Sequence, residues 1–206
     1  MPVDSRLIVG ARRADVADLA VLAAAATWDG PLAQTVVPDP RLRPGVLHAW
    51  YAILIRHALE HGRVDMSVDR RSAAVWLDRT VPLPAPADYL RRLTIGCGPH
   101  TAAILRHEQL LERHRPRTGH LQLAMLAARP GPAGVLLAHR HQRLDRAGIA
   151  AHAVAGSVDE LIVLTGAGYR AGAAIRLPDG PPLWPLWRRP TTGRAATRRP
   201  VLATAG

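Results

Sequence analysis

The amino-acid sequence predicts a mixed α/β domain with a mainly antiparallel sheet flanked by helices. Segments with the two-residue spacing of strands and segments with the three-to-four-residue spacing of helices follow one another along the chain. In residues 120–155 an apolar run, a helical pattern and a second apolar run come in that order, and a helix that crosses between two strands makes those strands parallel. We therefore expect one parallel pair, around Ala127 and Ala151, within this sheet.

The first part of the chain is expected to contain three strands and two helices. Apolar residues recur every three or four positions over 16–26 and 44–61, which predicts two helices, with Asp15 as the N-cap of the first and Gly62 as the C-cap of the second. Prolines interrupt residues 28–40, so this stretch is predicted to be irregular. The predicted strands lie over 7–11, 63–69 and 72–78, the last two joined as a hairpin.

The second part begins with a proline-rich stretch, residues 81–86, which we interpret as a stiff linker inside the domain. Four helices and four strands are predicted after it. The predicted helices cover 87–93, 100–114, 135–144 and 158–166, and the predicted strands cover 120–127, 149–155, 169–177 and 183–188.

The composition indicates one globular domain over residues 1–190, followed by a basic, disordered tail over 191–206. No apolar run approaches the roughly 18 residues of a membrane span. The tail combines arginines with Thr, Pro, Gly and Ala, which is typical of a disordered segment. Acidic residues lie on both sides of the short apolar run near the N-terminus, which argues against a signal peptide.

The net charge of +11 suggests nucleic-acid binding, but the residue types argue against it. All 27 basic residues are arginine and phenylalanine is absent, which is the bias of a very GC-rich gene rather than of a basic binding surface. A cationic surface still favours acidic ligands, such as the phosphates of a cofactor. Neither a nucleic acid nor a membrane is therefore an expected partner.

Cys97 is the single cysteine, so the sequence holds no disulfide framework and we expect a cytoplasmic protein. It lies in the segment Ile95-Gly-Cys-Gly-Pro99. That segment could present an exposed thiol, although a small residue packed in a turn is the simpler interpretation.

The ten histidines invite a search for metal ligands. His57 and His61 are four residues apart, with Glu60 between them, but this is not the HExxH pattern of a zinc site. We interpret these residues as the solvated face of a helix end and expect no metal.

Residues 129–134, Arg-Pro-Gly-Pro-Ala-Gly, form a tight turn between a predicted strand and a predicted helix. Such a turn can direct the backbone N–H groups of a helix N-terminus, which carries about half a positive charge, at a phosphate. Plain α/β architecture produces the same order of elements, so both interpretations stay open at this point.

Several segments resemble the GCN5-related N-acetyltransferases, in particular those common in GC-rich bacteria. The matching segments are Tyr51–Asp65, Ala74-Val-Trp-Leu77 with Pro82–Tyr89 after it, Leu137-Ala-His-Arg-His141 with Leu144-Asp145 and Gly148, Gly168-Tyr169, and Leu177–Arg188. The resemblance as a whole covers roughly residues 7–190 in a consistent order. The resemblance implies an acyl-CoA N-acyltransferase fold, in which the sheet opens into a V-shaped splay between its parallel strands.

The resemblance also implies acetyl-CoA, or another acyl-CoA, as cofactor and a small-molecule amine as substrate. In this family the backbone at the end of the fourth strand binds the pantetheine arm, and the turn after it holds the pyrophosphate. The corresponding cofactor-binding residues here are Leu126, Ala127, Ala128, Arg129, Gly131, Ala133 and Gly134. A homodimer is a further partner that the sequence leaves open.

Three functional positions of the family are changed in this sequence. The turn is about five residues short, and Pro130 and Pro132 remove N–H donors from it. Val154 stands at the position of a family Glu. Leu164 stands where a Tyr commonly protonates the leaving thiolate, which is general acid catalysis.

The acceptor side has also changed. Thr27 and Thr35 stand where the family has aromatic residues, and Trp28 beside Thr27 is a candidate to compensate as a substrate contact. His152 replaces a family Tyr on the predicted strand 149–155. It could line the acceptor cleft, with packing inside the sheet as the alternative.

His120 is the candidate catalytic residue. It starts the predicted strand 120–127, where the family also has His, and it shares a strand face with Gln122. His120 could act as a base or contact the substrate, and Gln122 is a candidate substrate contact. A hydrogen-bonded histidine at a strand end is the alternative interpretation of His120.

Two functions are compatible with these observations. The first is transfer of an acetyl or related acyl group from acyl-CoA to an amine, by direct attack in a ternary complex. The second is a protein of this fold that no longer uses CoA, and that catalyses a cyclisation or dehydration in the cleft or acts as a non-catalytic binding partner. The turn 129–134 distinguishes them, because only the first function needs free N–H groups there.

Overall fold

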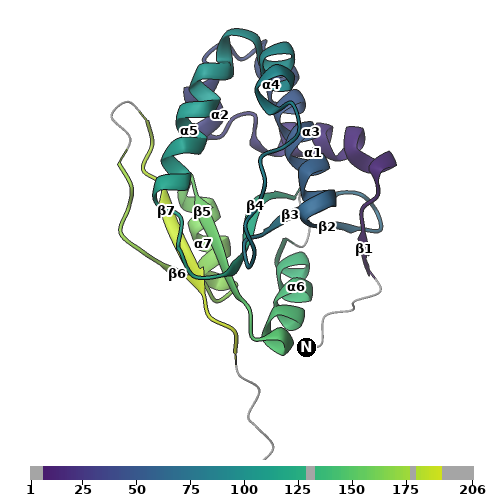
Figure 1. Ribbon diagram of the computed structural model, residues 1–206, viewed down its shortest axis with the longest axis vertical. Helices are drawn as coiled ribbons and strands as arrows, with labels where there is room; N and C mark the ends of the chain where they lie inside the picture. The colour runs from purple at the N-terminus through teal and green to yellow at the C-terminus, as the bar shows by residue number, and fades with distance from the viewer. Residues whose placement is uncertain (1–6, 129–132, 177–179, 192–206) are drawn as a thin grey trace, which may run out of the picture.

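Seven strands form one sheet in the spatial order β1–β2–β3–β4–β5–β7–β6 (Figure 1). The computed structural model describes residues 7–128, 133–176 and 180–191. The strands are β1 (Ile8–Gly10), β2 (Gly62–Ser67), β3 (Ser72–Asp78), β4 (His120–Ala128), β5 (Ala150–Ala155), β6 (Arg170–Ala171) and β7 (Trp184–Arg188). Among these strands β4 and β5 pair in parallel and the other neighbours are antiparallel, which confirms the predicted mixed α/β fold.

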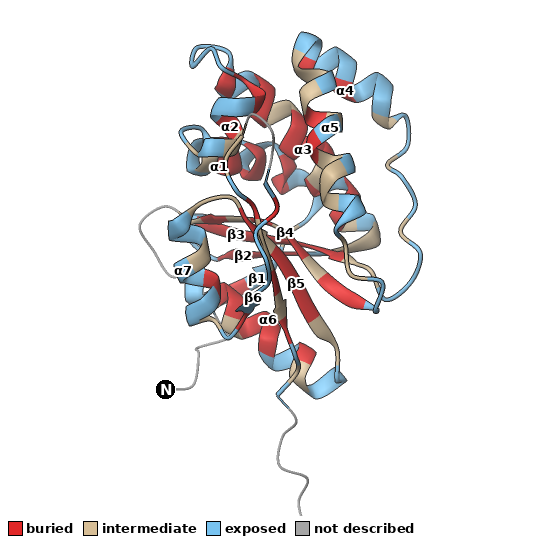
Figure 2. Ribbon diagram, turned by 90° about the vertical axis from the view of Figure 1, so that its left-hand side faces the viewer, coloured by how far each residue is buried: buried red, intermediate tan, exposed pale blue. Residues whose placement is uncertain are grey.

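Helices cover the two faces of the sheet, and each face buries its own apolar cluster (Figure 2). The helices are α1 (Val16–Thr27), α2 (Pro31–Val36), α3 (Arg43–His61), α4 (Tyr89–Cys97), α5 (Thr101–Arg113), α6 (Ala133–Ala147) and α7 (Val158–Gly166). Strand β3 lies between the clusters: Val75 packs on the side of α1 and α3, whereas Trp76 packs on the side of α6. None of the described helices is long and apolar enough to cross a membrane.

The two parallel strands separate part of the way along their length. Strands β4 and β5 pair from His120↔Ala150 to Leu123↔Ala153, while β4 continues to Ala128 with β3 as its partner on one edge. From Ala124 onward the other edge of β4 has no partner among the described strands. The sheet therefore opens between β4 and β5, which is the splay that the sequence resemblance implied.

A β-bulge lies where the strands separate. Val75 on β3 opposes Met125, whereas the next residue, Trp76, opposes Leu123, so Ala124 is the extra residue of β4. A bulge interrupts the alternation of side chains along a strand. Accordingly Leu123 packs in the cluster with α6, and Met125 packs in the cluster with α1 and α3.

Two ion pairs tie helix α6 to the sheet. Arg140 donates from Nε to Asp65 Oδ2 of β2 at 2.9 Å and from Nη2 to Asp65 Oδ1, and both side chains are buried. At the far end of α6, Asp145 accepts from both Nη atoms of Arg188 at 2.8 Å and also from the backbone N–H and hydroxyl of Thr191. The helix is therefore anchored at its centre and at its C-terminal end.

Most predicted elements are confirmed, and three predictions about helices and strands are wrong. The stretch 28–40, expected to be irregular, contains α2, because Pro31 occupies its first turn, where the missing N–H costs no hydrogen bond. Asp15 holds the N-cap position of α1, but its side chain does not cap the helix; its carboxylate accepts from the backbone N–H of Arg12 at 2.8 Å. The predicted strand 169–177 is reduced to the two residues of β6 and a single bridge from Ile175 to Leu183.

Gly62 is the C-cap of α3, as predicted, but it does not have the backbone conformation of a typical glycine cap. Its φ of −175° is extended backbone, not the left-handed conformation of a glycine cap. A Cβ atom at this position would lie 1.9 Å from the carbonyl oxygen of Trp76 on the neighbouring strand. The glycine therefore permits the close approach of β2 and β3.

Gly62→Ala is expected to destabilise the fold by about 1–3 kcal/mol, because the backbone of β3 has to move to admit the methyl group. Gly45→Ala is the matched control, since a Cβ at Gly45 in α3 meets nothing within 4 Å. Urea denaturation measures both variants. Equal stability of the two variants would contradict the role of close approach at Gly62.

Candidate active site

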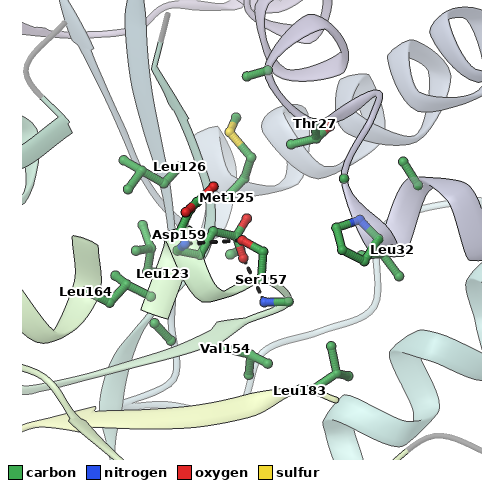
Figure 3. A pocket seen from close by; sticks show the side chains of 18 of the residues that line it. Thr27, Leu32, Leu123, Met125, Leu126, Val154, Ser157, Asp159, Leu164 and Leu183 are labelled. Atoms are coloured by element: carbon green, nitrogen blue, oxygen red, sulfur yellow. Dashed lines mark hydrogen bonds between the residues drawn. The ribbon is translucent and has the colours of Figure 1, made fainter. Parts of the chain in front are cut away.

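A cavity of about 520 Å³ occupies the opening between β4 and β5 (Figure 3). We call it the β4–β5 cavity. The labelled lining residues come from the α1–α2 region, from β4 and β5, from the start of α7, and from the segment before β7 (Figure 3). They are Thr27, Leu32, Leu123, Met125, Leu126, Val154, Ser157, Asp159, Leu164 and Leu183.

The described lining of the β4–β5 cavity is acidic. It includes Asp29, Asp159 and Glu160, and among its described residues there is no arginine. Glu160 accepts from the backbone N–H of Gly156 at 2.7 Å, and the hydroxyl of Ser157 accepts from the N–H of Glu160 at 3.2 Å. These bonds cap the N-terminus of α7 at the cavity wall.

A second cavity, of about 480 Å³, lies between α3, α5 and the linker 81–86. We call it the α3–α5 cavity. Several residues line both cavities: Leu32, Trp50, Tyr51, His107, Leu111, Gln122, Ala124 and Val154. The two cavities therefore meet at the point where β4 and β5 separate.

Glu108 of α5 is a desolvated carboxylate in the wall of the α3–α5 cavity. Its Oε1 atom accepts from the indole N–H of Trp50 at 3.0 Å and from the hydroxyl of Tyr89. Both donors are neutral, and no described arginine or histidine forms an ion pair with Glu108. Desolvation raises the pKa of Glu108, while the two hydrogen bonds oppose the rise. The Oε2 atom accepts no hydrogen bond from the described residues, so it is available to a ligand.

One helical turn further along α5, Glu112 lies between two arginines. Arg115 donates from Nε to Glu112 Oε1 at 2.7 Å, and Arg79 Nη2 lies 3.4 Å from Glu112 Oε2. Arg79 also donates from Nε to Gln122 Oε1 at 3.0 Å. All four of these side chains line the α3–α5 cavity, so the cavity has one purely acidic region and one mixed, net positive region.

His107 lines both cavities and is buried. Its Nδ1 atom has no hydrogen-bond partner among the described residues, and its ring lies edge-on to Trp50 with centroids 6.2 Å apart. Desolvation lowers the pKa of His107 to about 4, so the ring is neutral at pH 7.

His120, the catalytic candidate of the sequence, lies at the buried start of β4. Its side chain is 0% exposed, it is absent from the described lining of both cavities, and its Nδ1 atom is 2.7 Å from the carbonyl oxygen of Thr118. Its ring centroid is 5.3 Å from that of His152 and 5.4 Å from that of Trp187. This position fits the alternative interpretation, a hydrogen-bonded histidine at a strand end, better than contact with a substrate.

The three predicted substrate contacts are divided between two places. Gln122 lines both cavities, and His152 lines the α3–α5 cavity, beside Gln122 in the parallel ladder. Trp28 is 43% exposed and is absent from the described lining of both cavities. Its neighbour Thr27 lines the β4–β5 cavity.

The predicted cofactor residues follow the free edge of β4. Leu126, Ala128 and Ala133 line the β4–β5 cavity, whereas the side chain of Ala127 is buried in the cluster with α1 and α3. Gly134 is exposed in the first turn of α6. Arg129 and Gly131, with Pro130 and Pro132, lie outside the described residues, as does the predicted disordered tail from residue 192 onward.

The remaining chemical candidates are buried. Cys97 ends α4 with its Sγ atom 3.7 Å from the carbonyl oxygen of Val46, and desolvation raises its pKa to about 11, so it is not a reactive thiol. The prediction of a solvated His57 is wrong: the residue is buried, with its ring centroid 4.8 Å from that of His61. Within the described parts of the chain, no group of three or more potential metal ligands occurs.

Sequence reasoning missed Glu108, Tyr89, Trp50 and His107. Glu108 is 58 residues from Trp50 and 19 from Tyr89, so no local pattern joins them. The available signal was the spacing on α5, where Glu108 and Glu112 lie on one helix face.

Comparison with known proteins supports the fold and goes no further. No family model and no curated protein matches the sequence. Among solved structures, the protein called histone acetyltransferase HPA2 and related acetyltransferase, from Corynebacterium glutamicum, has a TM-score of 0.66 and 20% identity, over 91% of this chain and 98% of that one. Arylalkylamine N-acetyltransferase 2 from Aedes aegypti has a TM-score of 0.57 and 12% identity, over 89% and 98% of the two chains. An N-acetyltransferase from Staphylococcus aureus Mu50 has a TM-score of 0.55 and 13% identity, over 88% and 99%.

The chain thus has the fold of the GCN5-related N-acetyltransferases. The similar structures are N-acetyltransferases, and they match this chain over nearly all of their own length.

Proposed function

We propose that this protein transfers an acyl group from acyl-CoA to the primary amine of a small molecule. One observation carries the proposal: the β4–β5 cavity meets the α3–α5 cavity at Gln122 and Val154, and the α3–α5 cavity has a desolvated carboxylate and aromatic side chains in its wall. An acyl transfer needs two such compartments, because the amine and the thioester have to approach each other within about 3–3.5 Å. We also propose a cytoplasmic location, because a sequence with one cysteine has no disulfide framework of the kind typical of small secreted domains.

The described residues fit the pantetheine arm of the donor. That arm is uncharged, and the β4–β5 cavity offers it apolar side chains and the unpaired edge of β4 from Ala124 to Ala128. Acyl-CoA would supply an activated carbonyl, and backbone N–H groups along this edge are suited to polarise it. Because the cavity lining is acidic, the phosphates of acyl-CoA would lie outside it, and the N-terminus of α6 at Ala133 and Gly134 would be suited to hold them.

Glu108 is suited to receive the acceptor. An amine reaches the site as an ammonium ion at neutral pH, and the available Oε2 atom of Glu108 can bind it and take one of its protons. The neutral amine nitrogen would then form a bond to the acyl carbon as the bond from that carbon to sulfur breaks, and the second proton lost from the nitrogen would pass to solvent. Leu164 cannot donate a proton to the departing sulfur, so it leaves as a thiolate.

A second function has a specific observation in its favour. Asp29, Asp159 and Glu160 line the cavity that the donor would occupy, and an acidic lining is unfavourable for an anionic ligand. The alternative is therefore a protein of this fold that has lost CoA, and that catalyses a cyclisation or dehydration in the cleft or acts as a non-catalytic partner.

Calorimetric titration with acetyl-CoA, alongside free CoA, separates the two functions. Acyl transfer predicts binding with a Kd of ~1 to tens of µM, about −6 to −8 kcal/mol. Val154→Trp should abolish this binding, because Val154 lines the β4–β5 cavity, whereas Val21→Trp on the exposed face of α1 should retain it. Absence of heat and of any thermal shift at millimolar acetyl-CoA would overturn the acyltransferase proposal.

A further inference from the structure

We propose that the acceptor is an ω-amino acid, a molecule whose amine and carboxylate are separated by a chain of several carbons. This inference rests on the proposed acyl transfer and specifies its substrate class. It is carried by the two charged regions of the α3–α5 cavity, which have opposite signs and lie one turn of α5 apart.

The acidic region is Glu108 alone. Its only partners among the described residues are the neutral donors of Trp50 and Tyr89, so its negative charge is not balanced by a protein cation. Both donors bind the same oxygen atom, which leaves the other oxygen to a cationic group in the cavity. A primary ammonium satisfies that requirement.

The positive region is formed by Arg79 and Arg115, which share the single carboxylate of Glu112. Two guanidinium groups and one carboxylate leave one positive charge. Nη1 of Arg79 and Nη2 of Arg115 have no hydrogen-bond partner among the described residues, and the two side chains are only 18% and 30% exposed. One further carboxylate would balance this charge and accept bidentate hydrogen bonds from a guanidinium group.

The separation of the two regions selects the length of the ligand. Glu108 and Glu112 are four residues apart, which is about 6 Å along a helix axis. An α-amino acid carries both groups on one carbon and cannot reach both regions. A chain of three to five carbons can, and the cavity wall beside it is apolar, with Leu83 and Leu111 among its residues.

Other amines match the cavity less well. A diamine would bring a second cation to the two arginines, which is repulsive. A simple alkylamine would leave the excess positive charge without a partner after displacing water from it, which costs binding free energy.

The test measures initial rates with acetyl-CoA and a set of amines: 4-aminobutyrate, 5-aminovalerate, 6-aminohexanoate, alanine, pentylamine and 1,5-diaminopentane. We expect kcat/KM for 5-aminovalerate to exceed that for pentylamine by at least tenfold. Arg115→Gln should reduce this ratio to near one, mainly by raising KM for 5-aminovalerate. Arg113→Gln is the matched control, because Arg113 is exposed at the end of α5, two residues before Arg115, and does not line the cavity.

The outcomes separate this inference from the proposed function. Turnover of pentylamine or the diamine at rates equal to or above that of 5-aminovalerate would overturn the inference and leave acyl transfer intact. Turnover of none of these amines would overturn the ω-amino acid as acceptor, whereas acyl transfer itself is overturned by the absence of acetyl-CoA binding in the calorimetric titration. Calorimetric titration of the protein with each amine, without acetyl-CoA, measures binding separately from turnover. Binding of 5-aminovalerate but not of pentylamine supports the proposed selectivity of the cavity, and equal binding contradicts it.

Discussion

Glu108→Gln is expected to lower kcat/KM for the acceptor amine by about 100-fold or more, which is the lower range for loss of a general base. Glutamine retains an oxygen atom that can accept from Trp50 and Tyr89, so the local hydrogen bonds can persist. What it loses is the negative charge that binds the ammonium group and the basicity that removes its proton. Steady-state rates with acetyl-CoA and a saturating range of amine measure the effect.

Two further variants define what the result means. Glu60→Gln removes an exposed carboxylate of α3 that is paired with Arg13 and is absent from the described lining of both cavities, and it should leave kcat/KM unchanged. Tyr89→Phe removes a hydrogen bond that lowers the pKa of Glu108, so the acidic limb of the pH profile should move to higher pH. Full activity of Glu108→Gln, or an unmoved limb in Tyr89→Phe, would exclude Glu108 as the base.

The sequence was sufficient for the elements that have local signals. The helix over 158–166 matches α7 residue for residue, and Ser157 caps it as Ser does in many helices. The parallel pair was predictable because a helical pattern lies between two apolar runs. The requirement for glycine at position 62 was not predictable, because it comes from a contact with Trp76 on another strand rather than from a local conformation.

The site was less predictable than the fold for a similar reason. The bulge at Ala124 breaks the two-residue alternation that identifies a strand face, so the direction of each later side chain of β4 could not be read from the sequence. Trp50, Tyr89 and Glu108 come from three helices, and only their packing brings them together. The family resemblance made His120 the catalytic candidate, but its side chain is buried in the sheet.

Acidification from pH 7 to pH 5 is expected to lower the free energy of unfolding by about 4–6 kcal/mol, through three buried histidines. Desolvation lowers the pKa of His107 and His152 to about 4 and that of His141 to about 3. The positive charge of Arg188 contributes further at His141, and His120, Arg115 and Arg79 contribute at His152. Such a loss is a large fraction of the roughly 5–15 kcal/mol that stabilises a typical domain.

The direction follows from where each state binds protons. In the unfolded chain these rings bind protons from about pH 6.5 downward, whereas the folded chain binds them only near pH 4 or below. Between those values the unfolded state binds more protons than the folded state. Each histidine therefore lowers the free energy of unfolding by about 2 kcal/mol at pH 5. The raised pKa of Glu108 acts in the opposite direction and offsets part of the loss. Arg188 holds the pKa of Asp145 well below its usual range, so its contribution is lost only at still lower pH.

His152→Phe tests this account most sharply. Both ring nitrogens of His152 are buried without a hydrogen-bond partner among the described residues, so phenylalanine removes two unsatisfied polar atoms and fills a similar volume. We expect equal or higher stability at pH 7 and a loss between pH 7 and pH 5 that is about 2 kcal/mol smaller than in the parent protein. His114→Phe, at the exposed end of α5, should leave the loss unchanged. Urea denaturation at the two pH values measures the free energy of unfolding of all three proteins. If His152→Phe loses as much of it between pH 7 and pH 5 as the parent protein does, then protonation of His152 does not contribute to the loss.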